Sequence, residues 1–146
     1  MATQHELFFK EPGTWLGQGV ISFTMTQDQL RFYARWTVTE VDLNDIYCTQ
    51  EIEIDGMSDK MENSIHITDV SQGKFKINLE NSLWGVVQGE GLISDATVAW
   101  EFRRQGEGFE GLEVYEKSGE GQYLLKADYL SPDMYRTMIE GELWKK

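Results

Sequence analysis

The sequence predicts an all-β fold, an antiparallel up-and-down β-barrel of about ten strands. Apolar and polar residues alternate along most of the chain, which is the period of a half-buried strand. Clusters of turn-forming residues recur roughly every 10–16 residues, close to the spacing of hairpin-linked strands. The links between strands are too short for the helix that a parallel crossover needs. An open sheet of this size would leave two long unpaired edges, so we expect the sheet to close.

Each strand is expected where alternation is clearest. Between 30 and 38, for example, Phe32 and Trp36 share one face while Arg31 and Arg35 share the other. The same reasoning predicts strands over 15–25, 30–38, 46–55, 65–67, 75–80, 96–103, 111–117, 122–130 and 135–145, with a further strand between the turn clusters at 80–82 and 93–95. Other turn clusters lie at 26–29, 42–45, 55–60, 71–74, 105–108, 118–121 and 131–134.

We expect one domain over residues 1–146. Residues 1–12 precede the first strand as an N-terminal segment. Within it, residues 6–10 can form one helical turn before Pro12, serving as a short apolar plug at the base of the barrel. Both prolines, Pro12 and Pro132, fall outside the strand patterns, as the hydrogen bonding of a sheet requires.

Composition narrows the function classes. The chain carries 25 acidic and 13 basic residues, a formal net charge of −12, and this field repels nucleic acid and anionic membrane surfaces. The single cysteine, Cys48, excludes an intramolecular disulfide. The N-terminus does not read as a signal peptide, and the apolar runs are too short for a membrane helix. We therefore expect a cytoplasmic protein without membrane insertion.

Trp15 stands at the start of the first predicted strand between glycines. Gly13 allows the chain to turn after Pro12, and Gly17 and Gly19 lie on the face of Trp15. We expect these four residues to be structural, with the indole lying along the floor of the barrel in the room that the glycines leave.

The segment Gly13-Thr14-Trp15 resembles the Gly-x-Trp motif of the calycins, which include the lipocalins and the fatty-acid-binding proteins. The "GQG" that follows and the strand count are similar to the small intracellular members, the fatty-acid-binding-protein-like and nitrobindin-like barrels. The resemblance implies a calycin-like barrel that binds a small molecule. Lipocalins also place a basic residue near the end of the last strand, over the tryptophan, and here the chain ends in Lys145 and Lys146.

The chain departs from these families in two respects. Nitrobindin-like domains bind haem through a histidine late in the chain, whereas the histidines here are His5 and His66, so we expect no haem or other cofactor. The 26–29 link has no room for the helical lid of fatty-acid-binding proteins.

A ligand site is expected inside the barrel, where aromatic residues on inward faces are joined by a few polar ones. The predicted ligand-binding residues are Phe23, Phe32, Trp36, Gln50, Gln88, Trp100, Phe102, Arg104 and Glu116. Gln88 shares a face with Trp84 and Val86, and Glu116 shares one with Leu112 and Val114. Arg104 either points inward to an anionic ligand group or lies at the exposed end of its strand.

The sequence does not indicate a reactive thiol, a metal site or a phosphate-binding loop. Cys48 lies on an apolar face and is expected to be buried and inert. His66 is expected to be exposed on its strand, and no motif indicates a metal site. The glycine-rich "GVVQGEG" at 85–91 lacks the strand–loop–helix context of a phosphate-binding loop.

Three functions stay open at this point. The first is a binding barrel for a mostly apolar small molecule. The second is an enzyme that uses a carboxylate or a tyrosine as acid and base, for which the sequence names no catalytic residue. The third is an interaction or structural protein with a filled core. Apolar residues on both faces, as at Leu124-Leu125 and Met138-Ile139, favour an outer surface that is covered in a homodimer.

Overall fold

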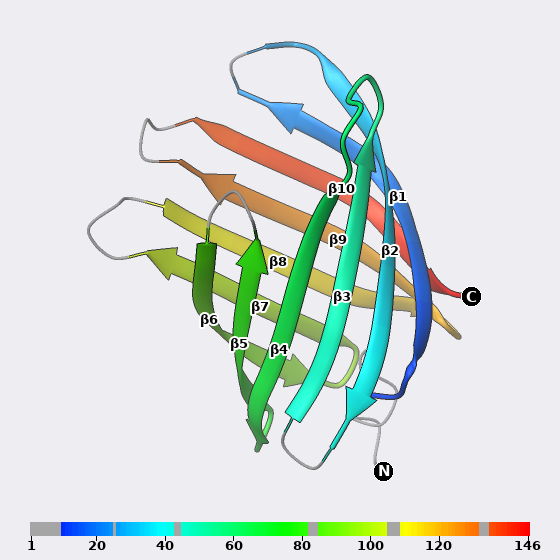
Figure 1. The fold of residues 1–146 in the computed structure, drawn as a ribbon, viewed down its shortest axis with the longest axis vertical. Helices are drawn as coiled ribbons and strands as arrows, with labels where there is room; N and C mark the ends of the chain where they lie inside the picture. Colours follow the sequence, from blue (N-terminus) through cyan, green and yellow to red (C-terminus); the bar gives the residue numbers. More distant parts are fainter. Residues whose placement is uncertain (1–9, 25, 43–44, 82–84, 105–108, 132–134) are drawn as a thin grey trace.

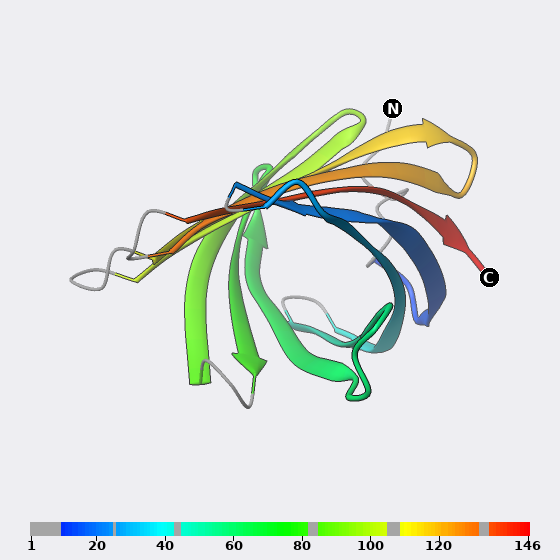
Figure 2. The same cartoon turned by 90° about the horizontal axis from the view of Figure 1, so that it is seen from above.

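The computed structural model describes residues 10–24, 26–42, 45–81, 85–104, 109–131 and 135–146, without the side chains of Arg104 and Phe109. Its strands close into a single antiparallel barrel, and the predicted fold class is confirmed (Figures 1 and 2). The strands are β1 (Gly13–Phe23), β2 (Gln29–Val41), β3 (Asp45–Ile54), β4 (Met61–Ser71), β5 (Lys74–Asn81), β6 (Gly85–Ser94), β7 (Thr97–Arg104), β8 (Phe109–Gly119), β9 (Gln122–Leu130) and β10 (Arg136–Lys145).

Every strand pairs with its neighbour in the sequence, and β1 pairs with β10 to close the barrel. The closing register runs from Trp15 opposite Lys145 to Phe23 opposite Thr137. Because the closure is complete, no strand edge in the described barrel is left to pair with another chain. In the part of the chain that the structure describes, no helix is long and apolar enough to cross a membrane.

Most strand bounds lie within a few residues of the prediction. The main difference is β4, which spans Met61–Ser71 rather than 65–67. Asn63 hid the extension at its start, because a polar residue on the inner face breaks the apolar alternation. The predicted helical turn over 6–10 falls on residues that, but for Lys10, lie outside the described part of the chain.

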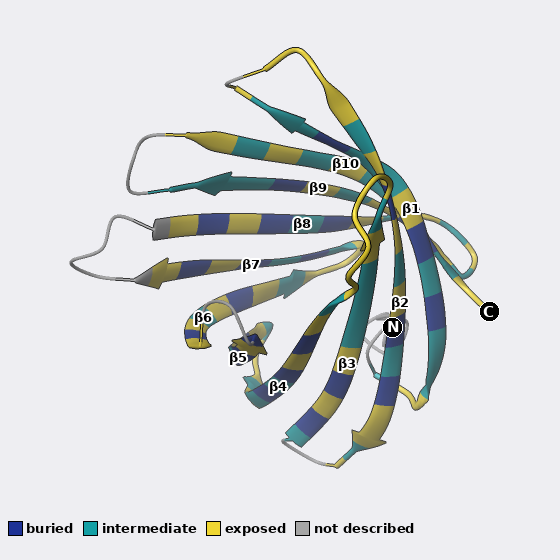
Figure 3. Ribbon diagram, turned by 45° about the horizontal axis from the view of Figure 1, so that its top comes forward, coloured by how far each residue is buried: buried dark blue, intermediate teal, exposed yellow. Residues whose placement is uncertain are grey.

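Burial alternates along the strands as the pleat requires (Figure 3). The inward side chains form one apolar core that is rich in aromatic residues, and its largest fully buried members are Trp36, Tyr115 and Tyr123. The barrel has two ends. We call the one that holds the turns at 72–73, 95–96 and 120–121 the Trp15 end, and the one that holds the turn at 55–60 the Ile54 end.

Several glycines leave space for rings on the neighbouring strand. A Cβ added at Gly91 would overlap the ring of Phe75, and one added at Gly111 would overlap the ring of Tyr129. The surroundings of Gly17 correct the expectation that the Trp15 indole lies in the space that the glycines leave. The space over Gly17 is taken by Leu143 of β10 rather than by the indole.

Trp15 itself packs edge-on against Tyr123, with ring centroids 5.7 Å apart, and is buried at its end of the barrel. Lys145 is its register partner on the last strand. The Lys145 ammonium lies at the rim, 4.0 Å from the Glu11 carboxylate.

We expect Gly91→Ala to lower the free energy of unfolding by about 1–3 kcal/mol, because the buried Phe75 ring cannot move aside cheaply. Urea unfolding of both proteins measures the difference. Gly119→Ala is the control, because a Cβ there meets mainly the flexible Gln122 side chain and should change stability little. Equal stability of the two variants would show that Gly91 is not needed for ring packing.

Candidate functional site

A buried acid lies on the inner wall of the barrel. Glu113 of β8 is 8% exposed, and the Tyr115 hydroxyl donates a hydrogen bond of 2.6 Å to its Oε1. The Tyr129 hydroxyl of β9 donates to its Oε2. Trp100 of β7 is the cross-strand partner of Glu113. Three neighbouring strands therefore converge on one carboxyl group.

The protonation of this cluster follows from its burial. Loss of solvent raises the pKa of Glu113, and hydrogen bonds from Tyr115, Tyr129 and Trp100 oppose the rise. Burial and then the nearby Glu113 charge raise the pKa of both tyrosines well above the ordinary value. The tyrosine hydroxyls thus keep their protons and act as donors, while the carboxyl is the group that can change its charge.

Aromatic packing fixes the cluster in place. Trp100 lies 4.8 Å from Tyr115 between ring centroids, and Trp36 lies 6.1 Å from Trp100 and 6.2 Å from Tyr115. Tyr115 is 0% exposed. A side chain held this tightly presents its hydroxyl in one geometry, so the orientation of the carboxyl is fixed.

A second polar group spans three other strands. The Asn63 amide donates to Gln50 Oε1 at 2.7 Å, and the Asn81 amide donates to Asn63 Oδ1 at 2.5 Å. The three residues are register partners across β3, β4 and β5, and Gln50 is also the partner of Trp36. Trp36 therefore joins the amide group to the aromatic packing around Glu113.

The two ends of the barrel are packed differently. The partly buried apolar residues that pack against the core come from strand segments toward the Trp15 end, namely Val41, Val70, Ile93 and Leu125. At the Ile54 end, partly exposed apolar side chains continue the inward faces of β1 to β4, namely Phe23, Leu30, Ile52, Ile54 and Met61. Residues 25, 82–84, 105–108 and 132–134 lie outside the described residues.

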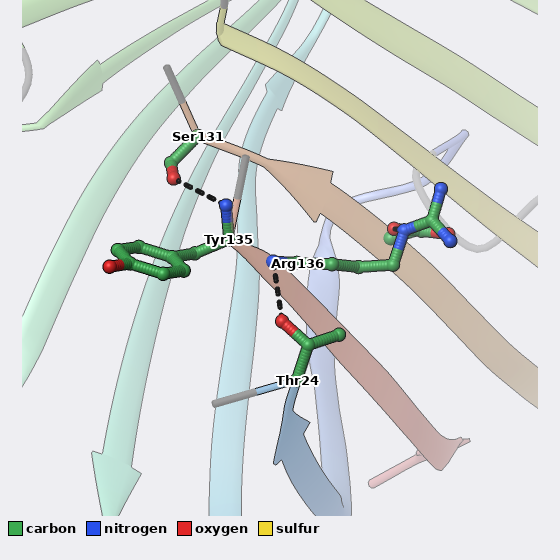
Figure 4. A network of polar contacts seen from close by, with 5 residues as sticks. Thr24, Ser131, Tyr135 and Arg136 are labelled. Carbon is green, nitrogen blue, oxygen red and sulfur yellow. Dashed lines mark hydrogen bonds and ion pairs between the residues drawn. The ribbon is translucent and has the colours of Figure 1, made fainter. Parts of the chain in front are cut away.

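Polar contacts hold part of the rim of the Ile54 end (Figure 4). The Arg136 backbone N–H donates to Thr24 Oγ1 at 3.1 Å, and the Tyr135 N–H donates to Ser131 Oγ at 3.3 Å. The Arg136 guanidinium also pairs with Asp128 at 3.1 Å. These contacts fasten the beginning of β10 to β1 and β9 beside the opening of the barrel.

Several predicted ligand-binding residues do face the interior. Phe32, Trp36, Trp100 and Phe102 are buried there, and Phe23 is half-buried at the Ile54 end. Gln50 is half-buried and belongs to the amide group. Arg104 is the last residue of β7, and its side chain lies outside the described residues, so its predicted role stays untested.

Two predicted residues are on the wrong face. Gln88 and Glu116 are exposed on the outer surface. The prediction took the face with more apolar residues as the inner one, whereas Val86 is 54% exposed and Leu112 is 46% exposed. The inner face of β8 instead carries Gly111, Glu113 and Tyr115, so the buried acid was missed. One sequence signal could have revealed it: Gly111 and Tyr115 share the face of Glu113, and a glycine also shares an inner face with a large aromatic residue on β1.

The other singled-out residues lie away from this cluster. Cys48 is buried as predicted, and burial raises the pKa of its thiol to about 12, which keeps it unreactive. His66 is only half-exposed, which corrects the expectation. Its ring stacks on Tyr47 at 4.2 Å, and its Nε2 lies 2.9 Å from Asp45. Among the described residues, no group of three or more metal-ligating side chains is placed to hold a metal.

The outer wall has its own apolar surface. A shallow groove of about 330 Å³ crosses β8, β9, β10 and β1, with Val20, Leu112, Val114 and Met138 in its lining. Leu124 is also exposed on this side. The homodimer inferred from these residues stays a prediction.

We expect Glu113 to make the protein less stable as the pH rises. Its pKa in the folded state lies above the ordinary value of 4.5, so the folded state holds the proton more tightly than the unfolded chain. The resulting stabilisation is present below the unfolded pKa and is lost as the pH rises through the folded pKa. Glu113→Gln should remove this dependence, so its stability relative to the wild type should increase with pH.

Urea unfolding at a series of pH values measures that difference. Glu110→Gln, which removes an exposed acid on the other face of β8, is the control and should run parallel to the wild type. A constant difference between Glu113→Gln and the wild type would contradict the expectation.

Known proteins resemble this chain in fold and not in sequence. No family model matches the chain, and no curated protein matches it in sequence. Solved structures do match. The S-type phycobiliprotein lyase CPES from Guillardia theta is 12% identical with a TM-score of 0.73, over 100% of this chain and 93% of that one. Rv2717c from M. tuberculosis is 9% identical with a TM-score of 0.74, over 100% of this chain and 98% of that one. This likeness concerns the fold, which in this chain is a closed barrel of ten antiparallel strands.

Proposed function

We propose that the chain is a binding barrel for a small, mostly apolar molecule that enters at the Ile54 end. The observation that carries this proposal is the unequal packing of the two ends. Partly buried apolar side chains near the Trp15 end pack against the core, whereas Phe23, Ile54 and Met61 leave apolar surface partly exposed at the other end. Exposed apolar surface of this kind is favourable to cover with a ligand.

The interior polar groups support the same proposal. Ligand sites in proteins combine apolar and aromatic walls with a few placed polar groups. Glu113 supplies one such group, and Gln50 with its asparagine neighbours supplies another. Both are joined to the aromatic packing through Trp36, Trp100 and Tyr115. A ligand at the Ile54 end would find apolar contacts first and hydrogen-bonding groups further in.

The comparisons support a barrel of a kind that hosts ligands, and function does not follow from fold alone. Since one fold neighbour is named a phycobiliprotein lyase, a bilin pigment belongs among the molecules to be tested. We place the binding activity in the cytoplasm, as the sequence predicts.

Acid–base catalysis is the second candidate, and Glu113 is the observation that favours it. A buried carboxyl with a raised pKa beside two tyrosines is an arrangement that enzymes use for proton transfer. If the bound molecule is also converted, Glu113→Gln should lose turnover while it keeps binding. Turnover that survives the substitution would rule out this role.

We expect an uncharged, environment-sensitive dye to bind the protein saturably. Ile54→Asp should weaken binding of the dye about tenfold or more. The aspartate side chain is short and stays in the path of the ligand, so an apolar ligand would have to lie against an unpaired charge, which costs free energy. Val41→Asp, at a residue of similar burial near the Trp15 end, is the matched control and should bind the dye as the wild type does. Fluorescence titration measures all three. Absence of saturable binding, or equal loss in both variants, would overturn the proposal.

A further inference from the structure

We propose that Glu113 selects ligands that carry a protonated amine or a similar N–H cation, an inference that rests on the proposed binding function. The carboxyl is placed by three strands, and the two oxygens accept from different tyrosines. Two donors on different strands fix the orientation of the carboxyl, as a binding group that is positioned in advance requires.

The count of hydrogen bonds leaves room for a ligand. An ionised carboxylate offers about four acceptor positions. Tyr115 occupies one on Oε1 and Tyr129 occupies one on Oε2, and Trp100 faces the carboxyl from the neighbouring strand. Among the described residues, these hydrogen bonds leave at least one acceptor position for a donor on the ligand.

The charge on the carboxyl favours a cationic donor. The described groups that act on Glu113 from β7, β8 and β9 are Trp100, Tyr115 and Tyr129, which are all neutral donors at neutral pH. Ala127 and Ile139 continue its register row on β9 and β10 and carry no ionisable group. None of these described side chains supplies a positive charge, and a buried carboxylate is stabilised most by one.

The position of Tyr129 connects this carboxyl with the Ile54 end. Tyr129 pairs with Gly111, two residues closer to that end than the pairing of Glu113 with Ala127. Its side chain is only partly buried, whereas Tyr115 on the other side of Glu113 is fully buried. Tyr129 therefore lies between Glu113 and the Ile54 end. A ligand carboxylate there would meet a like charge, which weakens binding.

The test compares three ligands that share one alkyl chain and differ in the head group: dodecylamine, dodecanol and dodecanoate. Each displaces the uncharged dye at neutral pH, below its micelle concentration. For the wild type we expect the amine to bind about tenfold more tightly than the alcohol, and the alcohol more tightly than the carboxylate. In Glu113→Gln the amine should lose its advantage over the alcohol. Glu110→Gln removes an equal charge from the outer face of β8 and should keep the wild-type order, which controls for attraction to the acidic surface.

The outcomes separate the two proposals. If the dye and dodecanol do not bind, the binding function fails and this inference fails with it. If dodecanol binds and the amine is no better, or if Glu110→Gln loses as much selectivity as Glu113→Gln, only the choice of ligand class is overturned.

Should Glu113→Gln not fold, the wild type decides alone. Its preference for amine over alcohol should rise with pH through the titration of Glu113, since the carboxyl must release its proton to pair with the cation. A preference that is flat from about pH 5 to about pH 9 would overturn the inference.

Discussion

The pairing of β1 with β10 is the contact on which the rest of the structure depends. Without it the sheet has two exposed edges and no enclosed interior. Gly19 and Gly141 lie directly opposite each other at the middle of this pairing, and a Cβ on Gly19 would collide with the backbone of β10. The two backbones can therefore approach only because both residues are glycines. The interior site exists because these small residues let the first strand meet the last.

The same relation between small and large residues shapes the interior. Gly91 receives the Phe75 ring, and Gly111 receives the Tyr129 ring. The second of these places the Tyr129 hydroxyl on Glu113. Burying an acid costs free energy unless the acid is hydrogen-bonded. The position of Glu113 therefore depends on tyrosine rings, and the Tyr129 ring has room on the inner face because residue 111 is a glycine. The polar cluster is thus a result of how the barrel is packed.

The architecture could be predicted from the sequence because alternation and turn chemistry are local properties. The face of a strand could not always be predicted, since the choice depends on which side the barrel closes around. On β8 the apolar residues Leu112 and Val114 argued for one face, and closure buried Glu113 and Tyr115 on the other. Gln88 on β6 was misplaced for the same reason. Asn63 and Asn81 escaped notice because each is satisfied by a residue far along the chain, which no local pattern reveals.

The order of the strands also bears on how the chain reaches this state. All pairings except the closing one join strands that are adjacent in the sequence, so hairpins can form and zip together with little loss of chain entropy. The contact between Trp15 and Lys145 spans almost the whole chain and can be made only when the other strands are already in place. We therefore expect closure to come last in folding. Until then Glu113 faces water, and the unpaired edges of β1 and β10 are open to other chains.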